Sequence, residues 1–272
     1  MRKVLVIGQS AVAIIWEAEE ITGLMENLFF PWHNQKEEAE FTVLIERKAA
    51  DYRVSMEGAF SSRVEKASLV TTMEQVITQL ASEILSDCLL IHAAVIDFNG
   101  SGIIISGQHG SGKTTLALTA LSSGCTALTD EVAVLCRDTC TLQGFPRPFR
   151  VREGTLALKP SIIPMDCPRT VSPEGITHVF ISAPGLPYYQ PQTQTSLILF
   201  PVRRPGKTVV RDISEREALE SLFPQGFNFH LRPDGCLFML IALIRNHRAM
   251  EIGYSDHWHA IHTLQDIILR SP

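Results

Sequence analysis

Hydrophobic and polar residues alternate in short runs over the first third of the chain. Four of these runs have the composition of β-strands, and they are VLVIG (4–8), FTVLIER (41–47), YRVSMEG (52–58) and ASLVT (67–71). A helix is expected to follow the first strand. A later stretch has the apolar spacing of an amphipathic helix, at Met73, Val76, Leu80, Ile84 and Leu85. The pattern predicts a helix over 72–87 and a small α+β module over 1–87.

The next stretch contains a hairpin signal. LLIHAAVIDF (89–98) and SGIIIS (101–106) are two apolar runs joined by Asn99-Gly100. Because both turn residues tolerate positive φ, this pair predicts a tight β-hairpin. TTLALTALSS (114–123) then has the composition of a helix.

Strands and helices continue to alternate towards the C-terminus. Gly124 is the expected stop of the preceding helix. The remaining elements are expected as strands at 125–129, 132–135 and 196–201, proline-rich connections at 145–175, and helices at 214–223, 234–248 and 256–270. This succession predicts an α/β domain over 88–272.

A glycine-rich stretch, GQHGSGKT (107–114), lies between the second hairpin strand and the following helix. It matches GxxxxGK[ST] at every fixed position, and the strand before it and the helix after it are the setting that this phosphate loop requires. Glycines let the backbone N–H groups turn inward, and the helix N-terminus favours negative charge. Lys113 is expected to reach the β and γ phosphates of ATP and Thr114 to bind Mg²⁺. The predicted nucleotide-binding residues are Gly107, Gln108, His109, Gly110, Ser111, Gly112, Lys113, Thr114 and Thr115, with the His109 side chain pointing outward.

Further residues with catalytic chemistry lie on both sides of the loop. His92 stands fifteen residues before Gly107, and Asp130-Glu131 follows Thr114 by sixteen and seventeen residues, after an expected strand. In an open α/β sheet the carboxyl end of a strand faces the ligand. One carboxylate can therefore meet a metal ion and the other an incoming hydroxyl group. The sequence contains neither an acidic strand of the usual ATPase kind nor an NKxD guanine motif.

This arrangement, over residues 89–135, resembles HPr kinase/phosphorylase and its relatives. The resemblance implies a P-loop kinase core related to the phosphoenolpyruvate carboxykinases, with ATP and Mg²⁺ as cofactors. It also implies roles for individual residues. Lys113 and Thr114 match the phosphate and Mg²⁺ residues, Asp130 the carboxylate that takes the proton from a serine, His92 its assistant, and Glu131 the neighbouring position near the metal.

Two other segments extend the resemblance. FPRPFRVREG (145–154) and FPVRRPG (200–206) are similar to stretches in shorter HPr-kinase-related proteins of peptide-modifying gene clusters, including lasso peptide kinases. The chain has no clean copy of the LEIRG-like signature of HPr kinases. The resemblance therefore implies a peptide or another protein as acceptor, and it allows a homo-oligomer.

Several basic residues and histidines have two interpretations each. Arg147, Arg150 and Arg152 cluster closely enough to contact phosphate oxygens or to form a solvated basic loop. Arg203-Arg204 either contacts a ligand or lies on the surface. HWHAIH (257–262) imitates a metal cluster, but a structural role is favoured because no acidic partner has zinc-like spacing.

Composition excludes several classes of protein. The chain is 45% hydrophobic and 19% charged, with a net charge of -5 and no block of lysine and arginine, so a general nucleic-acid surface is not expected. No apolar run approaches the roughly 20 residues of a membrane helix. A cytoplasmic protein with reduced, buried thiols at its six cysteines is expected.

The sequence thus predicts an ATP-dependent kinase that phosphorylates a serine or another hydroxyl group of a peptide or protein. A lasso-type precursor peptide is one candidate acceptor. Two alternatives stay open: a nucleotide-binding regulatory protein without phosphotransfer, and a kinase of a small metabolite.

Overall fold

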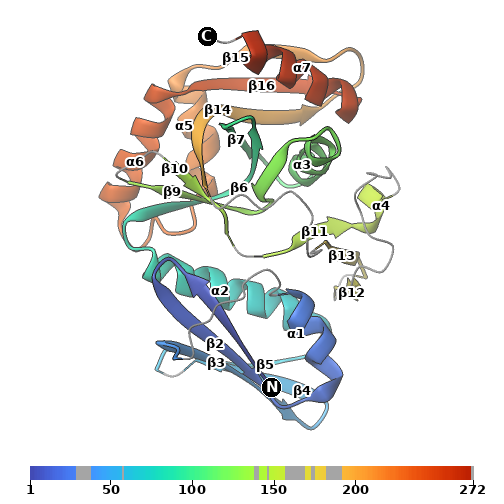
Figure 1. Ribbon diagram of the computed structural model, residues 1–272, viewed down its shortest axis with the longest axis vertical. Coiled ribbons are helices and arrows are strands. Elements are labelled where there is room, and N and C mark those ends of the chain that lie inside the picture. Colours follow the sequence, from blue (N-terminus) through green and yellow to red (C-terminus); the bar gives the residue numbers. More distant parts are fainter. Residues whose placement is uncertain are drawn as a thin grey trace. The chain divides into compact units, whose positions relative to one another are not determined.

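The chain folds into two compact units of helices and β-sheet (Figure 1). The computed structural model describes residues 1–28, 38–56, 58–137, 141–145, 147–156, 169–172, 175–181 and 192–270. The first unit contains the described residues up to Ser86 together with 147–156, 169–172 and 175–181. The second contains the described residues from Asp87 to Phe145 and from 192 onwards. The architecture is therefore mixed α/β with several sheets.

A five-stranded sheet forms the main part of the first unit. Its strands, in sheet order, are β1 (Arg2–Ile7), β2 (Ser10–Trp16), β3 (Phe41–Lys48), β4 (Asp51–Met56) and β5 (Phe60–Val64). Its helical segments are η1 (Glu19–Ile21), α1 (Thr22–Leu28), η2 (Lys66–Ser68) and α2 (Leu69–Ile84). Figure 1 shows α2 lying along the sheet, and the apolar stripe of this helix is buried.

Two local predictions for this unit are wrong. The helix expected after residue 8 is strand β2, which pairs with β1 through a turn at Gly8 with φ +60°. The strand expected at 67–71 contains the start of α2, because Leu69, Val70 and Met73 continue the helical apolar stripe towards the N-terminus.

A three-stranded sheet belongs to the same unit. Its members are β11 (Phe149–Arg152), β13 (Thr177–Ile181) and β12 (Arg169–Val171), with α4 (Glu153–Leu156) after β11. The stretch expected as connections thus contains strands. The structure also differs from the expected continuous domain over 88–272, because this segment clusters with the first unit. Two arginines of the segment form ion pairs with Glu74 of α2.

An eight-stranded sheet forms the centre of the second unit. Its path is β10 (Thr141–Gln143), β9 (Val132–Cys136), β6 (Cys88–Phe98), β7 (Ser101–Ser106), β14 (Gln192–Arg203), β16 (Arg248–Tyr254) and β15 (Val209–Asp212), with β8 (Thr126–Thr129) also pairing with β6. β14 is parallel to both β7 and β16. The carboxyl ends of these three strands therefore lie at one edge of the sheet.

Helices cover both faces of this sheet. They are α3 (Lys113–Ser122), α5 (Glu215–Leu222), α6 (Pro233–Asn246) and α7 (His257–Arg270), with the short turn η3 (Phe223–Gln225) after α5. The apolar side chains of α5 and α6 pack in one cluster with alternate residues of β6, including Leu89, Ile91 and Ala93. Figure 1 shows α3 and α7 together on the opposite side. None of the described helices is long and apolar enough to cross a membrane.

The predicted hairpin is confirmed. Asn99 and Gly100 have φ values of +53° and +88°, and β6 pairs with β7 in antiparallel register. The expected helix stop at Gly124 is also confirmed, with φ +88°. β15 and β16 were not predicted, because Glu251 and Gly253 interrupt the short apolar run of β16.

Candidate functional site

The glycine-rich loop joins β7 to α3, as its setting in the sequence predicts. Gly107, Gly110 and Gly112 have φ values of +149°, +80° and +101°, a region that favours glycine. Gly112 is the residue that precedes the first turn of α3. The first N–H groups of that helix have no acceptor within the helix and carry partial positive charge, so this loop can hold an anion.

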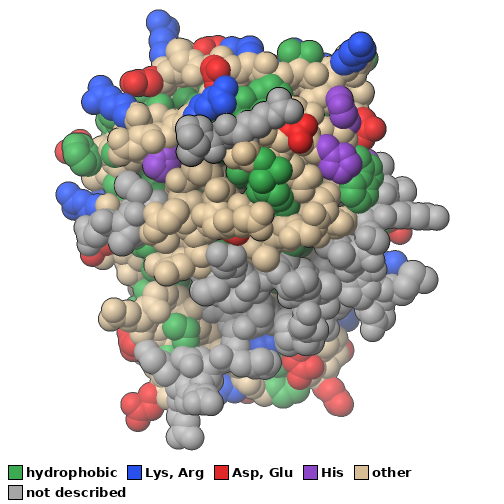
Figure 2. Space-filling view, turned by 45° about the horizontal axis from the view of Figure 1, so that its top comes forward, with side chains coloured by type: hydrophobic (Ala, Val, Ile, Leu, Met, Phe, Trp, Pro, Cys, Tyr) green, Lys and Arg blue, Asp and Glu red, His purple; other side chains and the backbone are tan. Residues whose placement is uncertain are grey.

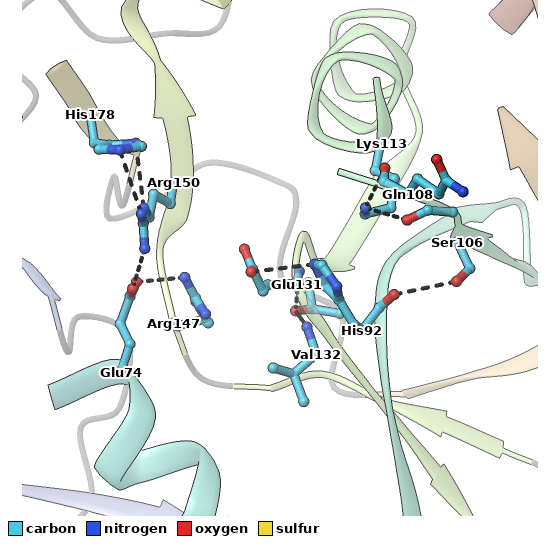
Figure 3. Close-up of polar contacts among 12 residues, drawn as sticks. Glu74, His92, Ser106, Gln108, Lys113, Glu131, Val132, Arg147, Arg150 and His178 are labelled. Atoms are coloured by element: carbon cyan, nitrogen blue, oxygen red, sulfur yellow. Dashed lines mark hydrogen bonds and ion pairs between the residues drawn. The ribbon is translucent and has the colours of Figure 1, made fainter. Parts of the chain in front are cut away.

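Lys113 is turned back onto the loop. Its Nζ donates hydrogen bonds to the carbonyl oxygens of Gly107 at 2.7 Å and of Gln108 at 3.3 Å (Figure 3). The residue is only 8% exposed. Burial lowers the pKa of Lys113 below its ordinary value, and the negative charges of Glu131 and Asp130 act in the opposite direction. Both carboxylates are therefore within electrostatic range of the ammonium group.

The other predicted loop residues take different positions. Gln108 and His109 are exposed, in agreement with the expected outward direction of His109. Thr114 is half-buried in the first turn of α3, and Thr115 is buried. The Ser111 Oγ is buried and has no hydrogen-bond partner among the described residues. A buried hydroxyl group of this kind fits a ligand with polar oxygens.

A short turn between β8 and β9 carries the acidic pair. The Thr129 Oγ1 accepts hydrogen bonds from the backbone N–H groups of Glu131 at 3.3 Å and Val132 at 3.2 Å, which holds the turn in shape. Asp130 is only 1% exposed, whereas the Glu131 side chain is 33% exposed. The two neighbouring carboxylates therefore differ in their access to solvent.

His92 lies opposite Glu131. Its Nε2 is 3.4 Å from the Glu131 Oε1, and the Ala93 N–H donates to the Glu131 carbonyl oxygen at 3.1 Å (Figure 3). His92 is also the partly exposed position in an otherwise buried run of β6 from Cys88 to Asp97. The sequence associates His92 with Asp130, whereas the carboxylate that the structure places against its ring is that of Glu131.

Two residues from distant parts of the sequence complete the edge of the sheet beside the loop. Tyr254, at the end of β16, donates its hydroxyl hydrogen to the Ser111 carbonyl oxygen at 3.2 Å. A Cβ atom on Gly112 would lie 2.0 Å from the Tyr254 hydroxyl and 3.3 Å from the Arg203 Nε. Burial raises the pKa of Tyr254, and a hydrogen bond from Arg203 acts against this. Arg203 is thus a cation at the start of α3.

Sequence reasoning missed Tyr254. The residue stands 143 positions after Ser111, and only the parallel pairing of β14 with β7 and β16 brings it to the loop. The sequence explains Gly112 by the backbone conformation of the loop. The Tyr254 hydroxyl, which occupies the place of a Cβ atom, is a second reason why this position has no side chain.

The structure places Arg147 and Arg150 in the first unit, around Glu74. Arg147 Nη2 is 2.5 Å from the Glu74 Oε1, and Arg150 Nη1 is 2.7 Å from the Oε2 (Figure 3). Arg150 Nε also donates to His178 Nδ1 at 3.4 Å. Both guanidinium groups therefore have a structural partner, and their contact with phosphate stays a prediction.

The remaining candidates have ordinary structural contacts. Arg204 lies 3.5 Å from the Glu251 carboxylate, and His259 Nδ1 is 2.9 Å from the Thr208 Oγ1. Among the described residues, no group of three or more His, Cys, Asp and Glu side chains could hold a metal ion. Figure 2 shows both acidic and basic side chains on the face in view.

The sequence matches no family model and no curated protein. Among solved structures, the chain is similar to the HPr(Ser) kinase/phosphatase from Coxiella burnetii, with 15% sequence identity and a TM-score of 0.35. The match covers 66% of this chain and 91% of that chain.

Proposed function

We propose that the chain is an ATP-dependent kinase that transfers the γ-phosphate to a serine or another hydroxyl group of a peptide or protein. The observation that carries this proposal is the convergence of three elements in the second unit. The glycine loop with Lys113 follows β7, His92 lies on the adjacent β6, and the acidic pair lies on the turn before β9. The charges of this pair act on the Lys113 ammonium group.

The chain's residues have separate tasks in this proposal. Lys113 exchanges its two carbonyl acceptors for phosphate oxygens, which are stronger acceptors because they are charged. The start of α3 and the buried Ser111 hydroxyl provide further donors. Arg203 supplies a second positive charge, held in place by Tyr254. Bound MgATP supplies the phosphoryl group and a metal that neutralises its charge.

The residues present fit a nucleotide-bound Mg²⁺ better than a site made by protein alone. The described residues contain no cluster of three or more acidic, cysteine or histidine ligands. Mg²⁺ in kinases keeps waters and phosphate oxygens and takes one or two protein ligands. Thr114 would complete such a shell together with Glu131, or with Asp130 if Glu131 is the base.

Two carboxylates can accept the proton of the acceptor hydroxyl. The resemblance described in the sequence analysis implies this task for Asp130, with His92 as its assistant. The exposure of Glu131 and its contact with His92 favour Glu131, since a general base must reach its substrate. In either case the acidic pair performs the proton transfer.

Asp130→Asn and Glu131→Gln test the proposal together. With γ-labelled ATP and peptides that carry a C-terminal serine, we expect one of them to lower transfer to peptide by about 100-fold or more, since a positioned base contributes that much. Nucleotide affinity should change far less in that variant. Glu220→Gln, an exposed acidic position of the same unit, is the matched control.

Other outcomes would support the alternatives. Transfer at near-parental rates in both variants would contradict the assignment of the base. Label that passes only to water, with every acceptor tried, would indicate a nucleotide-dependent regulatory protein. Label that passes to a small molecule from a metabolite extract would indicate a metabolite kinase.

A further inference from the structure

Two cysteines of the second unit lie directly opposite each other on neighbouring strands. Cys88 begins β6 and Cys136 ends β9, and the antiparallel register pairs them. Their Sγ atoms are 3.5 Å apart. Neither of them is in a disulfide. Cys140 and Cys167 lie outside the described residues.

The hydrogen bonds of the ladder show which kind of pair this is. The Arg137 N–H donates to the Asp87 carbonyl oxygen at 3.2 Å, so the adjacent pair is a hydrogen-bonded one. Because such pairs alternate along an antiparallel ladder, Cys88 and Cys136 form a non-hydrogen-bonded pair. The hydrogen bond of the Cys88 carbonyl oxygen is consistent with this, because the oxygen points away from β9 and accepts from Asn228 Nδ2 at 2.9 Å.

This position has the geometry that a covalent link needs. Cα atoms of a non-hydrogen-bonded pair lie about 4.5 Å apart. Disulfides span Cα separations of roughly 4.4 to 6.8 Å. The two strands therefore accept a bridge without a change of register, and only the sulfur atoms have to approach each other.

The two thiols differ in accessibility. Cys88 is 8% exposed, and the hydrogen bond with Cys136, followed by burial, raises the pKa of its thiol. Cys136 is partly exposed at the end of β9. An oxidant in solution therefore meets Cys136 first, and Cys88 lies in place to react with the product.

We propose that Cys88 and Cys136 are a modification site, at which a low-molecular-weight disulfide oxidises the pair to an intramolecular disulfide. The Cys136 thiolate attacks one sulfur of the small disulfide, which forms a mixed disulfide and releases one small thiol. Cys88, after losing its proton, attacks the Cys136 sulfur and releases the second small thiol. The protein loses two hydrogens, and one small disulfide is reduced to two thiols.

The bridge joins residues 48 positions apart and encloses the glycine loop, His92 and the acidic pair. Closing a segment of this length restricts the unfolded chain, which stabilises the folded state. Because the sulfur atoms are already close, we expect the bridge to leave the folded structure unchanged and to act on the free energy of unfolding. This inference does not depend on the proposed phosphotransfer.

The test uses the reduced full-length chain, treated with oxidised glutathione and compared with the untreated chain. Tryptic digestion without reductant should join the peptide of residues 67–113, which contains Cys88, to the peptide of residues 114–137. The latter also contains Cys125, so Cys125→Ser is the matched control and Cys136→Ser the test variant. We expect the link in the parent and in Cys125→Ser, and its absence in Cys136→Ser.

Thermal unfolding gives the second measurement. Oxidation should raise Tm by about 5 °C or more in the parent and in Cys125→Ser, and leave Cys136→Ser unchanged. The inference is overturned if glutathione forms no link between these peptides. It is equally overturned if the link maps to Cys125 or Cys140, or if the bridged protein has the Tm of the reduced one. Because Cys136 is partly exposed, its serine variant is expected to fold.

Discussion

The molecule contains two clusters of charged side chains that differ in what their cations contact. In the first unit, Arg147 and Arg150 bind the two oxygens of the buried Glu74 carboxylate. In the second unit, Lys113 binds two backbone carbonyl oxygens. A carboxylate is a full negative charge and holds its partners more strongly than a neutral group does. Neutral carbonyl groups are weaker acceptors, which an anionic ligand can replace.

The comparison shows that burial and charge alone do not identify a ligand site. Lys113 and the Arg147 side chain are both largely hidden from solvent. What separates them is the partner, and we expect an arginine that already has a carboxylate to contribute mainly to the fold. Arg203 resembles Lys113 in this respect, because its described partner is the neutral hydroxyl group of Tyr254.

The largest effect is expected in the first cluster. Glu74→Gln leaves two guanidinium groups facing a neutral amide in a buried place, and we expect it to lower the free energy of unfolding by about 3 to 5 kcal/mol. Nucleotide affinity should stay at the parental level. Chemical denaturation followed by circular dichroism, with ATP titration of the folded protein, measures both.

Two further variants make this comparison decisive. Glu83→Gln changes an exposed carboxylate on the same helix and should leave stability nearly unchanged. Arg147→Ala should behave like Glu74→Gln. If it instead abolishes phosphotransfer while the unfolding curve stays parental, the arginine acts on phosphate, as the sequence allows, and the distinction between the two clusters fails.

The second effect concerns the lysine of the loop. Lys113→Met should lower ATP affinity by about 100-fold, which corresponds to about 2.7 kcal/mol, because the charged donor to the phosphates is lost. Isothermal titration measures this, and Lys207→Met, an exposed lysine of the same unit, is the matched control. Equal affinities in the two variants would show that Lys113 is only a structural cap of the loop.

The free energy of unfolding of the same variant should depend on pH differently from that of the parent. Burial lowers the pKa of Lys113, so the unfolded chain retains this proton at pH values where the folded chain has released it. The free energy of unfolding therefore gains a contribution that rises as pH increases towards about 10.5. Lys113→Met lacks this contribution. The free energy of unfolding of the parent should therefore rise relative to that of the variant as pH increases over this range. Denaturation curves at neutral and alkaline pH measure that shift.

The sequence predicts local features of the second unit well. The Asn99-Gly100 turn, the glycine loop and the start of α3 depend on neighbouring residues and on backbone conformations that glycine favours. These features have short-range physical causes, so a short window of sequence contains them.

Contacts between distant strands were beyond the sequence. Tyr254 reaches Ser111 only through the order of β7, β14 and β16, and no local pattern encodes strand order. The ion pairs of Arg147 and Arg150 with Glu74 were not visible in the sequence either, because Glu74 lies more than 70 positions earlier. In both cases the residues were visible in the sequence, but the distant residues that they contact were not.

The smallest effect tests the second cation of the loop. Arg203→Gln should lower ATP affinity by about tenfold, equivalent to about 1.4 kcal/mol, because an exposed guanidinium group is partly screened by solvent. Since the loss is one of charge, raising the salt concentration should weaken ATP binding less in the variant than in the parent, and Arg203→Lys should recover most of the affinity. Arg216→Gln, whose side chain is 87% exposed, is the control and should bind like the parent. If Arg203→Gln and Arg216→Gln bind ATP equally while Lys113→Met does not, the anion site ends at the lysine, and Arg203 belongs with the structural arginines of the first unit.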